Sequence, residues 1–399
     1  MVMQRRARAL PLLLSALACG SARGTKLSGV FLSMYEQDVT FSAARWAEEL
    51  DAMHAVGIDT VIVGESASNT WPNYSYSVPQ PHRPFTNREV YYSNSTAAER
   101  VRVHAFWPTK LASTIPGYSM MDTGYEPLEH ILAAADARNM KVILGNADVP
   151  WVDQGGAQDW KMQAVLSHAI LDELWALYST HASLTGFYNA VELSCDVRNE
   201  KLGLEIAAQM FGPFADHVKL LRPSLRAVTS PYYRPANYSN PHTTQMAAAQ
   251  WGEFWRKVLT NASNFDTIAP QDGVGAGHNN LTTVRAYLGA LAKVTTELNR
   301  TLWSNVELFA PSEACAAKGS SSYCPASCVD RRPAPFERIE AQMKAEAVIA
   351  DDGFLIAYEW HAYLSPSSTA CNGASPISSP DWHLLAKEQY EKYKAYVKG

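Results

Sequence analysis

Apolar residues recur along this chain at two spacings, which predict strands and helices in turn. Short apolar segments that are bounded by turn residues predict eight strands. These segments lie at 27–35, 60–67, 141–147, 184–193, 225–233, 265–274, 301–309 and 354–364. Between and after them, apolar residues recur every three or four positions, as on one face of a helix. The predicted helices lie at 42–56, 127–138, 163–180, 200–221, 243–259, 282–298, 335–350 and 381–397.

This alternation predicts the fold class. Eight strands that are each followed by a helix are typical of an α/β protein with a single (β/α)8 TIM barrel. A doubly wound sheet is the alternative, but it usually has fewer such units and a switch point in its strand order. Four connections are long, and each follows the C-terminal end of a predicted strand, where barrels carry their active sites. They are residues 68–126, 148–161, 234–245 and 310–334.

Residues 1–24 predict a signal peptide, which leaves residues 25–399 for one barrel domain. Arg5, Arg6 and Arg8 precede a short apolar segment, and small residues follow it. The segment is too short to cross a bilayer, although a signal anchor is an alternative. We therefore expect a secreted protein, or one that resides in the lumen of the secretory pathway, with no membrane attachment beyond the leader.

Composition narrows the class of protein. The chain has 399 residues, of which 47% are hydrophobic, and a formal net charge of −5. These values are typical of a packed globular enzyme. The negative charge disfavours a surface for nucleic acid or for an anionic membrane. We expect a monomer that uses no cofactor and no metal.

Cysteines agree with an oxidising compartment. Cys315, Cys324 and Cys328 crowd into one loop, which suits an insertion that is pinned by a disulfide. Cys324 and Cys328 could instead be half of a zinc site, but no second pair of Cys or His stands at ligand spacing. In a eukaryotic secretory pathway, several N-glycosylation sequons would also carry glycans on the surface. The sequons are at Asn73, Asn94, Asn237, Asn261, Asn280 and Asn299.

Two glutamates stand at matching positions in the strand pattern. Glu192 ends the fourth predicted strand, and Glu307 ends the seventh. Because side chains alternate across a strand, Glu192 shares a face with Tyr188, and Glu307 shares one with Trp303 and Asn305. We expect both faces to point into the barrel, which would bring the two carboxyl groups together at its mouth.

Two carboxyl groups across a barrel mouth can hydrolyse a glycosidic bond. One, with a raised pKa, protonates the leaving oxygen, and the other acts at the anomeric carbon. A separation of roughly 5–5.5 Å would make the enzyme retaining. The alternative is that both glutamates are structural carboxylates that pair with basic side chains or cap the following helices.

Four segments resemble a family of uncharacterised, glycoside-hydrolase-like TIM barrels that is catalogued as a domain of unknown function. They are ARWAEELDAMHAVGIDTVIV (44–63), QDGVGAGH (271–278), LWSNVELF (302–309) and EWHAYLSP (359–366). The chain is also distantly similar to clan A glycoside hydrolases, and the resemblance extends over most of residues 27–365. It implies that Glu192 is the general acid/base and Glu307 the nucleophile. Val191 departs from the clan's pattern, which usually has Asn directly before the strand-four Glu.

Other residues at the predicted strand ends could bind a carbohydrate substrate. The candidates are Glu65, Trp151, Tyr232, Tyr233, Gln271, Asp272, Asn305, Trp360 and His361. On the eighth strand, alternation lets either Glu359 and His361 or Tyr358 and Trp360 face inward, but not both pairs.

Tryptophans lie on or beside the long connections. Exposed indoles at Trp71, Trp107, Trp151 and Trp160 could stack on pyranose rings along a glycan groove. The alternative is that these side chains are packed inward and anchor the loops.

The sequence therefore predicts a secreted glycoside hydrolase that acts on an oligo- or polysaccharide. One alternative is a catalytically inactive glycan-binding barrel, which Val191 favours. Another is a metal-dependent TIM-barrel hydrolase, although no HExxH or DxD-like spacing supports it. Its ligands would be Asp272, Glu307, Glu359 and His361. A serine hydrolase is disfavoured because the chain has no GxSxG motif.

Overall fold

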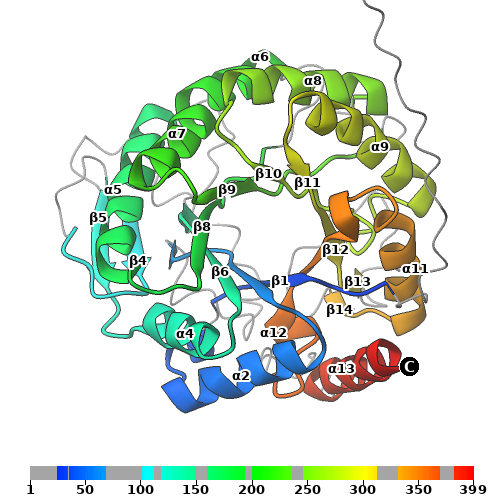
Figure 1. Cartoon of the computed structure of the whole chain (residues 1–399), viewed down its shortest axis with the longest axis horizontal. Helices are drawn as coiled ribbons and strands as arrows, with labels where there is room; N and C mark the ends of the chain where they lie inside the picture. Colours follow the sequence, from blue (N-terminus) through cyan, green and yellow to red (C-terminus); the bar gives the residue numbers. More distant parts are fainter. Residues whose placement is uncertain are drawn as a thin grey trace, which may run out of the picture.

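The chain forms a ring of parallel strands inside a ring of helices (Figure 1). The computed structural model describes residues 25–34, 36–68, 101–111, 118–148, 160–193, 200–235, 246–311, 331–368 and 382–399. The barrel strands are β1 (Gly29–Leu32), β2 (Thr60–Val63), β6 (Lys141–Gly145), β8 (Leu184–Asn189), β9 (Arg226–Thr229), β10 (Thr267–Ile268), β11 (Thr301–Leu302), β12 (Ser304–Glu307) and β15 (Leu355–Tyr358).

The barrel closes through its seventh strand, which Trp303 divides into β11 and β12. The first half, β11, pairs with β10, whereas the second half, β12, pairs with β15. A further bridge between Gln271 and Asn305 joins β12 to the end of the sixth strand. Because β11 and β12 are halves of one strand, the ring has eight strands. The predicted (β/α)8 TIM barrel is confirmed.

The helices of the outer ring lie close to the predicted positions. They are α2 (Ala43–Ala55), α4 (Pro127–Asp136), α5 (Trp160–Tyr178), α6 (Glu200–Ile206) with η1 (Ala207–Phe211) and α7 (Gly212–Leu221), α8 (Ala248–Asn261), α9 (Leu281–Glu297), α11 (Phe336–Glu346) and α13 (Trp382–Lys398). Two of them begin at side-chain caps, where Ser42 accepts from the Arg45 N–H and Asn280 accepts from the Thr283 N–H. Among the described residues, no helix is both long and apolar enough to cross a membrane.

Two small sheets lie outside the barrel, in segments that the sequence pattern predicts as long connections. One contains β3 (Ala67–Ser68), β4 (Val101–Ala105), β5 (Tyr118–Asp122) and β7 (Ala147–Asp148), and the other is a hairpin of β13 (Phe309–Pro311) and β14 (Arg331–Pro333). Glu173 on α5 holds the segment after β4, because its carboxylate accepts hydrogen bonds from Trp107 Nε1 at 2.7 Å and Thr109 Oγ1 at 2.6 Å. Trp107 is therefore a buried anchor, as the alternative for the loop tryptophans predicts.

The eighth strand is shorter than predicted. β15 ends at Tyr358, and a short helix, α12 (Trp360–Tyr363), replaces the second half of the predicted strand 354–364. Glu359 is the cause, because its carboxylate accepts the His361 and Ala362 N–H groups at 3.0 and 2.6 Å and so caps the helix. The strand-like alternation expected for residues 358–361 is wrong.

The barrel interior is filled by side chains. Each of the eight strands contributes one residue to a buried apolar cluster. Its members are Phe31, Ile62, Ile143, Tyr188, Val228, Ala269, Trp303 and Ile356. Tyr188 and Trp303 thus face inward, as strand alternation predicts, while a larger cluster fills the space between the sheet and the helices.

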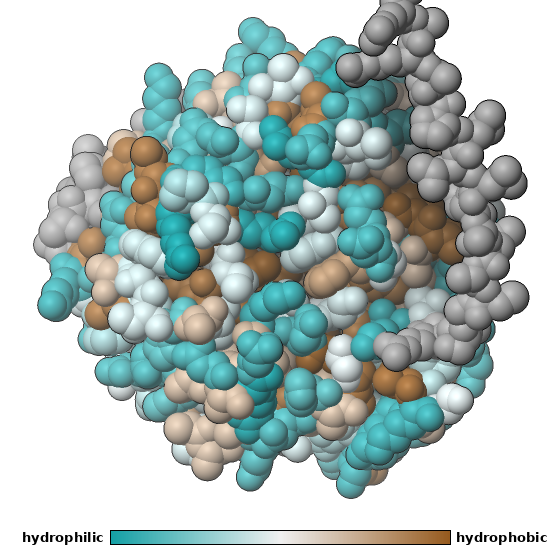
Figure 2. Space-filling view, viewed as in Figure 1, coloured by the Kyte–Doolittle hydropathy of each residue, from teal (hydrophilic) through white to brown (hydrophobic). Residues whose placement is uncertain are grey.

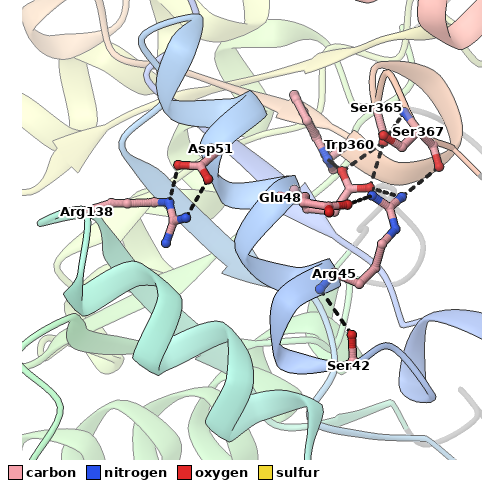
Figure 3. A network of polar contacts seen from close by, with 9 residues as sticks. Ser42, Arg45, Glu48, Asp51, Arg138, Trp360, Ser365 and Ser367 are labelled. Atoms are coloured by element: carbon pink, nitrogen blue, oxygen red, sulfur yellow. Dashed lines mark hydrogen bonds and ion pairs between the residues drawn. The ribbon is translucent and has the colours of Figure 1, made fainter.

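A buried carboxylate joins α2 to the segment after β15 (Figure 3). Glu49 has almost no exposed surface, and it accepts hydrogen bonds from the Arg45 side chain, from Trp360 Nε1 at 2.7 Å and from Ser365 Oγ at 2.8 Å. On the outside, hydrophilic residues predominate over the helix ring, with apolar residues scattered among them (Figure 2). The buried network around Glu49 therefore joins α2 to α12 and to the residues that follow it.

Candidate active site

Glu192 lies at the C-terminal end of the fourth barrel strand, three residues beyond β8. Its side chain is exposed, and Oε1 accepts a hydrogen bond from Gln271 Nε2 at 2.9 Å. The same amide group donates to the Ser230 carbonyl oxygen at 3.2 Å. Since the Gln271 backbone also bridges to Asn305, this one residue connects the ends of the fourth, fifth, sixth and seventh strands.

Glu307 is the last residue of β12, and only 5% of its surface is exposed. Its Oε2 accepts a hydrogen bond from the Ala276 N–H at 2.7 Å. The Arg338 side chain donates to the Glu307 backbone carbonyl at 3.0 Å. The carboxyl group and the backbone of Glu307 are therefore held from two sides, by the turn after β10 and by α11.

Arg331, the first residue of β14, brings positive charge to this end of the barrel. Its guanidinium group lies 4.2 Å from the centre of the Phe309 ring. Its charge acts on the carboxyl groups of both Glu192 and Glu307 and lowers the pKa of each. Both glutamates therefore lie within the electrostatic range of one cation.

Burial opposes ionisation of Glu307. Desolvation, followed by the nearby charge of Asp272, raises the pKa of Glu307 to about 8, and Arg331 acts in the opposite direction. Desolvation also raises the pKa of Glu192, although Gln271 and Arg331 counteract it. With a pKa of about 8, Glu307 is protonated at neutral pH.

A second set of acids lies behind Glu307. Asp272 and Glu346 have no exposed surface, and their carboxyl groups lie within hydrogen-bonding range of each other. Burial raises the pKa of both groups. Asp272 also accepts a hydrogen bond from the Gln342 side chain on α11. Asp272 was predicted to bind substrate, but its complete burial keeps it from direct contact.

Several predicted substrate-binding residues do lie at the C-terminal end of the barrel. Gln271, Tyr232 and Glu65 are half-buried there, and Arg234 lies over the Tyr232 ring at 5.6 Å. Asn305 lies deeper, with 1% of its surface exposed, and donates from Nδ2 to Ser230 Oγ at 3.0 Å. Of these residues, Gln271 contacts Glu192 directly.

Other predicted residues lie elsewhere. Tyr233 is buried among helices, where it stacks on Tyr287 with ring centres 4.6 Å apart. Trp360 and His361 are fully buried in α12, and His361 Nε2 lies 3.2 Å from Asp38 Oδ1. No sugar can stack on Trp360 in this arrangement. Trp151, like Trp71 and the cysteines, lies outside the described residues.

The set of metal ligands considered from the sequence is not assembled. Asp272 and Glu307 lie near α11, whereas Glu359 and His361 belong to the cap and first turn of α12. Among the residues that the structure describes, no three His, Cys, Asp or Glu side chains are grouped so that they could hold a metal ion.

Sequence patterns did not reveal three contributors to the site. Arg331 follows a long connection, and Glu346 lies in the last turn of a helix, so neither stands at a strand end. The third is the Ala276 N–H, a backbone donor. The closely spaced glycines of QDGVGAGH were the available signal, because Gly273 and Gly277 have positive φ and shape the turn that presents this group.

Comparisons with known proteins agree with the fold. Residues 27–370 match the model of a family described as "Domain of unknown function (DUF4434)". A structure from Bacteroides thetaiotaomicron VPI-5482, provisionally assigned as an alpha-L-fucosidase, is 19% identical with a TM-score of 0.61. That alignment covers 97% of this chain and 99% of the other. At this identity, the likeness shows the fold alone.

Two further structures are less similar. The endo-1,4-beta-mannanase from Rhizomucor miehei is 10% identical with a TM-score of 0.47, over 93% of this chain and 95% of that one. The GH53 catalytic domain of Ignisphaera aggregans is 13% identical with a TM-score of 0.45, over 68% and 77%. Among curated proteins, none matches the chain.

Proposed function

The chain belongs to the family described as Domain of unknown function (DUF4434), and we propose that it is a secreted glycoside hydrolase that cleaves O-glycosidic bonds of an oligo- or polysaccharide. The family that the four sequence segments resemble is thereby confirmed. One observation carries the proposal about function. Glu192 and Glu307, from the fourth and seventh strands, lie at one end of the barrel, where Gln271 bridges their strands and Arg331 acts on both carboxyl groups.

In the proposed reaction, one carboxyl group gives a proton to the leaving oxygen while the other attacks the anomeric carbon. This double displacement retains the anomeric configuration and requires the two carboxyl groups to be roughly 5–5.5 Å apart. The resemblance to clan A enzymes assigns proton transfer to Glu192 and nucleophilic attack to Glu307. A retained anomer in the first product, seen by proton NMR, is the expected outcome.

In the free protein, the raised pKa of Glu307 favours its protonated form, which is the form of a proton donor and not of a nucleophile. A nucleophile must be ionised, but burial and Asp272 raise the pKa of Glu307 to about 8. If Glu307 is the nucleophile, kcat/KM should increase with pH until about 8. If Glu307 is the proton donor, kcat/KM should decrease above that pH. The pH profile of kcat/KM, which reports groups of the free enzyme, therefore assigns the two roles.

The activity itself is tested with a panel of oligo- and polysaccharides. We expect Glu192→Gln and Glu307→Gln to reduce turnover by about 100-fold or more, since each removes a group that takes part in bond cleavage. Glu205→Gln is the matched control, because Glu205 is exposed on α6 and pairs, among the described residues, with Lys201 at the surface. Full turnover in both site variants would contradict the proposal.

A catalytically inactive glycan-binding barrel is the second candidate, and Val191 before Glu192 is the observation that favours it. In that case the parent protein would bind a glycan of the panel without cleaving it, and Glu307→Gln would bind it equally well.

Secretion is also part of the proposal and has its own test. N-terminal sequencing of protein recovered from the culture medium should begin near residue 25 if the predicted leader is removed.

A further inference from the structure

Asp272 and Glu346 form a pair of buried carboxyl groups between the seventh strand and α11. Neither has exposed surface, Glu346 Oε1 has no hydrogen-bond donor among the described residues, and the two carboxyl groups lie within hydrogen-bonding range of each other. An ionised carboxylate only accepts hydrogen bonds, so this contact requires a proton on one of the two groups. Two negative charges at this distance in a buried site would also repel each other strongly. The contact itself therefore indicates a shared proton.

The surrounding donors indicate which group carries the proton. Asp272 accepts a hydrogen bond from Gln342 Nε2, and its Oδ1 accepts the Val274 N–H at 2.9 Å. Among the described residues, Glu346 accepts a hydrogen bond from one donor, the Ser304 hydroxyl group, at 2.6 Å. Because more donors stabilise the ionised form, Asp272 is the carboxylate and Glu346 is the acid.

The pair is connected to Glu307 through two routes. Gln342 Nε2, which donates to Asp272, also lies 3.4 Å from the backbone oxygen of Glu307. The turn that begins at Asp272 carries the Ala276 N–H, which donates to Glu307 Oε2 at 2.7 Å. Asp272 thus holds one end of the turn and, through Gln342, lies next to the backbone of Glu307.

We propose that Asp272 and Glu346 are a positioning pair for Glu307. They share one proton, carry one negative charge between them, and hold Glu307 in place through Gln342 and through the turn that carries the Ala276 N–H. The other charged or titratable groups that face Glu307 are Arg331 on β14, Arg338 on α11 and Tyr233 after β9. The consequence for turnover rests on the proposed glycosidase function. The shared proton does not, and it can be measured without a substrate.

The test compares two variants that affect the shared charge differently. In Asp272→Asn, the remaining acid, Glu346, should stay protonated in its buried site, so the negative charge next to Glu307 is lost. In Glu346→Gln, the new amide replaces the proton as donor, and Asp272 keeps its charge. We expect Asp272→Asn to lower the pKa of Glu307 by at least about one unit, and Glu346→Gln to leave it near that of the parent.

The measurement is an infrared titration of the protonated carboxyl band in the full-length protein. Subtracting the spectrum of the same protein with Glu307→Gln isolates the Glu307 signal. Gln342→Met is a milder variant, because both acids remain. Without its amide donor, Asp272 retains one donor, as Glu346 does, so the negative charge is held less firmly on Asp272. The titration of Glu307 should then move in the same direction as in Asp272→Asn, by a smaller amount.

Equal shifts in Asp272→Asn and Glu346→Gln would mean that each acid carries its own charge, and the shared proton would be excluded. An unchanged Glu307 titration in both Asp272→Asn and Gln342→Met would also overturn the proposal. If a glycan is cleaved, the pH profile of kcat/KM should move together with the infrared titration. If no glycan is cleaved, the proposed function fails, while the infrared result still decides the positioning pair.

Discussion

Gly275 is packed tightly against Glu307. A Cβ atom at this position would lie 2.6 Å from the Phe309 carbonyl oxygen, 2.7 Å from Glu307 Cβ and 2.9 Å from Glu307 Oε2. We therefore expect Gly275→Ala to displace the Glu307 carboxyl group. The loss of stability should be about 1–3 kcal/mol, as for an overpacked core. Turnover of any glycan substrate should decrease by roughly 100-fold because a catalytic group is misplaced.

Gly289 on α9 is the matched control for this substitution, since a Cβ atom there would meet no other atom within 4 Å. Gly289→Ala should stabilise the protein by about 0.5–1 kcal/mol, because alanine loses less backbone entropy than glycine in a helix. Urea unfolding of the two variants gives the comparison. Equal stabilities in both variants would show that Gly275 is not packed against Glu307.

The raised pKa of Glu307 also predicts how stability depends on pH. The folded protein holds a proton on Glu307 until about pH 8, whereas the ordinary pKa of this side chain is 4.5. Between these values the folded state binds more protons than the unfolded state, so its stability decreases as pH rises. Glu307→Gln removes this decrease of stability with rising pH, because glutamine does not titrate. Its free energy of unfolding relative to the parent should therefore increase by a few kcal/mol from pH 5 to pH 9.

Urea unfolding at several pH values checks this prediction, with Glu205→Gln as the exposed control. A difference between Glu307→Gln and the parent that stays constant over this range would mean that Glu307 titrates like an ordinary glutamate.

At the scale of residues, the sequence predicted some side-chain positions and not others. The inward orientation of the Tyr188 and Trp303 side chains followed from strand alternation, because each residue lies in a strand or at a break within one. Asp272 lies beyond a strand of only two residues, β10, so alternation no longer determined its side. Arg331 reaches the mouth from a separate hairpin, and no local pattern encodes such a contact.

The contact between α2 and the segment after β15 depends on one buried carboxylate. Glu49→Gln keeps the shape of the side chain but loses its charge, and it sets an amide group against the donors Arg45, Trp360 and Ser365. We expect a loss of about 3–5 kcal/mol in the free energy of unfolding, as for a buried pair that is broken on one side.

Glu48 offers a direct comparison because it pairs with the same Arg45 but is largely exposed. Glu48→Gln should change the free energy of unfolding by less than about 1 kcal/mol. Urea unfolding measures both. If the two variants lose the same small amount, Glu49 does not join α2 to the end of the barrel.

At the scale of elements, the helices were predicted better than the strands. Helices such as α9 carry apolar stripes over several turns and begin at a capping residue, Asn280, so pattern and cap agree. The end of β15 was predicted too late, because the cap of α12 is a glutamate inside an apolar segment. The sheet that contains β4 and β5 depends on pairing with distant segments, which periodicity does not reveal.

Over the whole molecule, the described sequons predict where glycans would be attached. Asn261, Asn280 and Asn299 are all exposed. Asn261 is the last residue of α8, and Asn299 lies two residues after α9, on the side of the barrel opposite the mouth. In protein secreted from eukaryotic cells, we expect enzymatic deglycosylation to reduce the mass, and peptide mapping to find the attachment sites.

Asn261→Gln with Asn299→Gln should then lower the attached mass without changing turnover, since both sites lie away from Glu192 and Glu307. An unmodified peptide at all three positions would contradict the prediction.

At the scale of the whole molecule the sequence was most informative, because the order of strands and helices alone predicted the closed barrel. The break at Trp303 was not predicted, since the pattern of 301–309 runs through it without interruption.

The filled interior of the barrel limits how small molecules can reach Glu192 and Glu307. One side chain from every strand, including Trp303 stacked on Phe354 with ring centres 4.2 Å apart, blocks the axis below Glu192 and Glu307. Among the described residues, these side chains close the axis, so the C-terminal mouth is the open end of the barrel. If a glycan is hydrolysed there as proposed, the substrate, its products and water would all have to pass through this mouth.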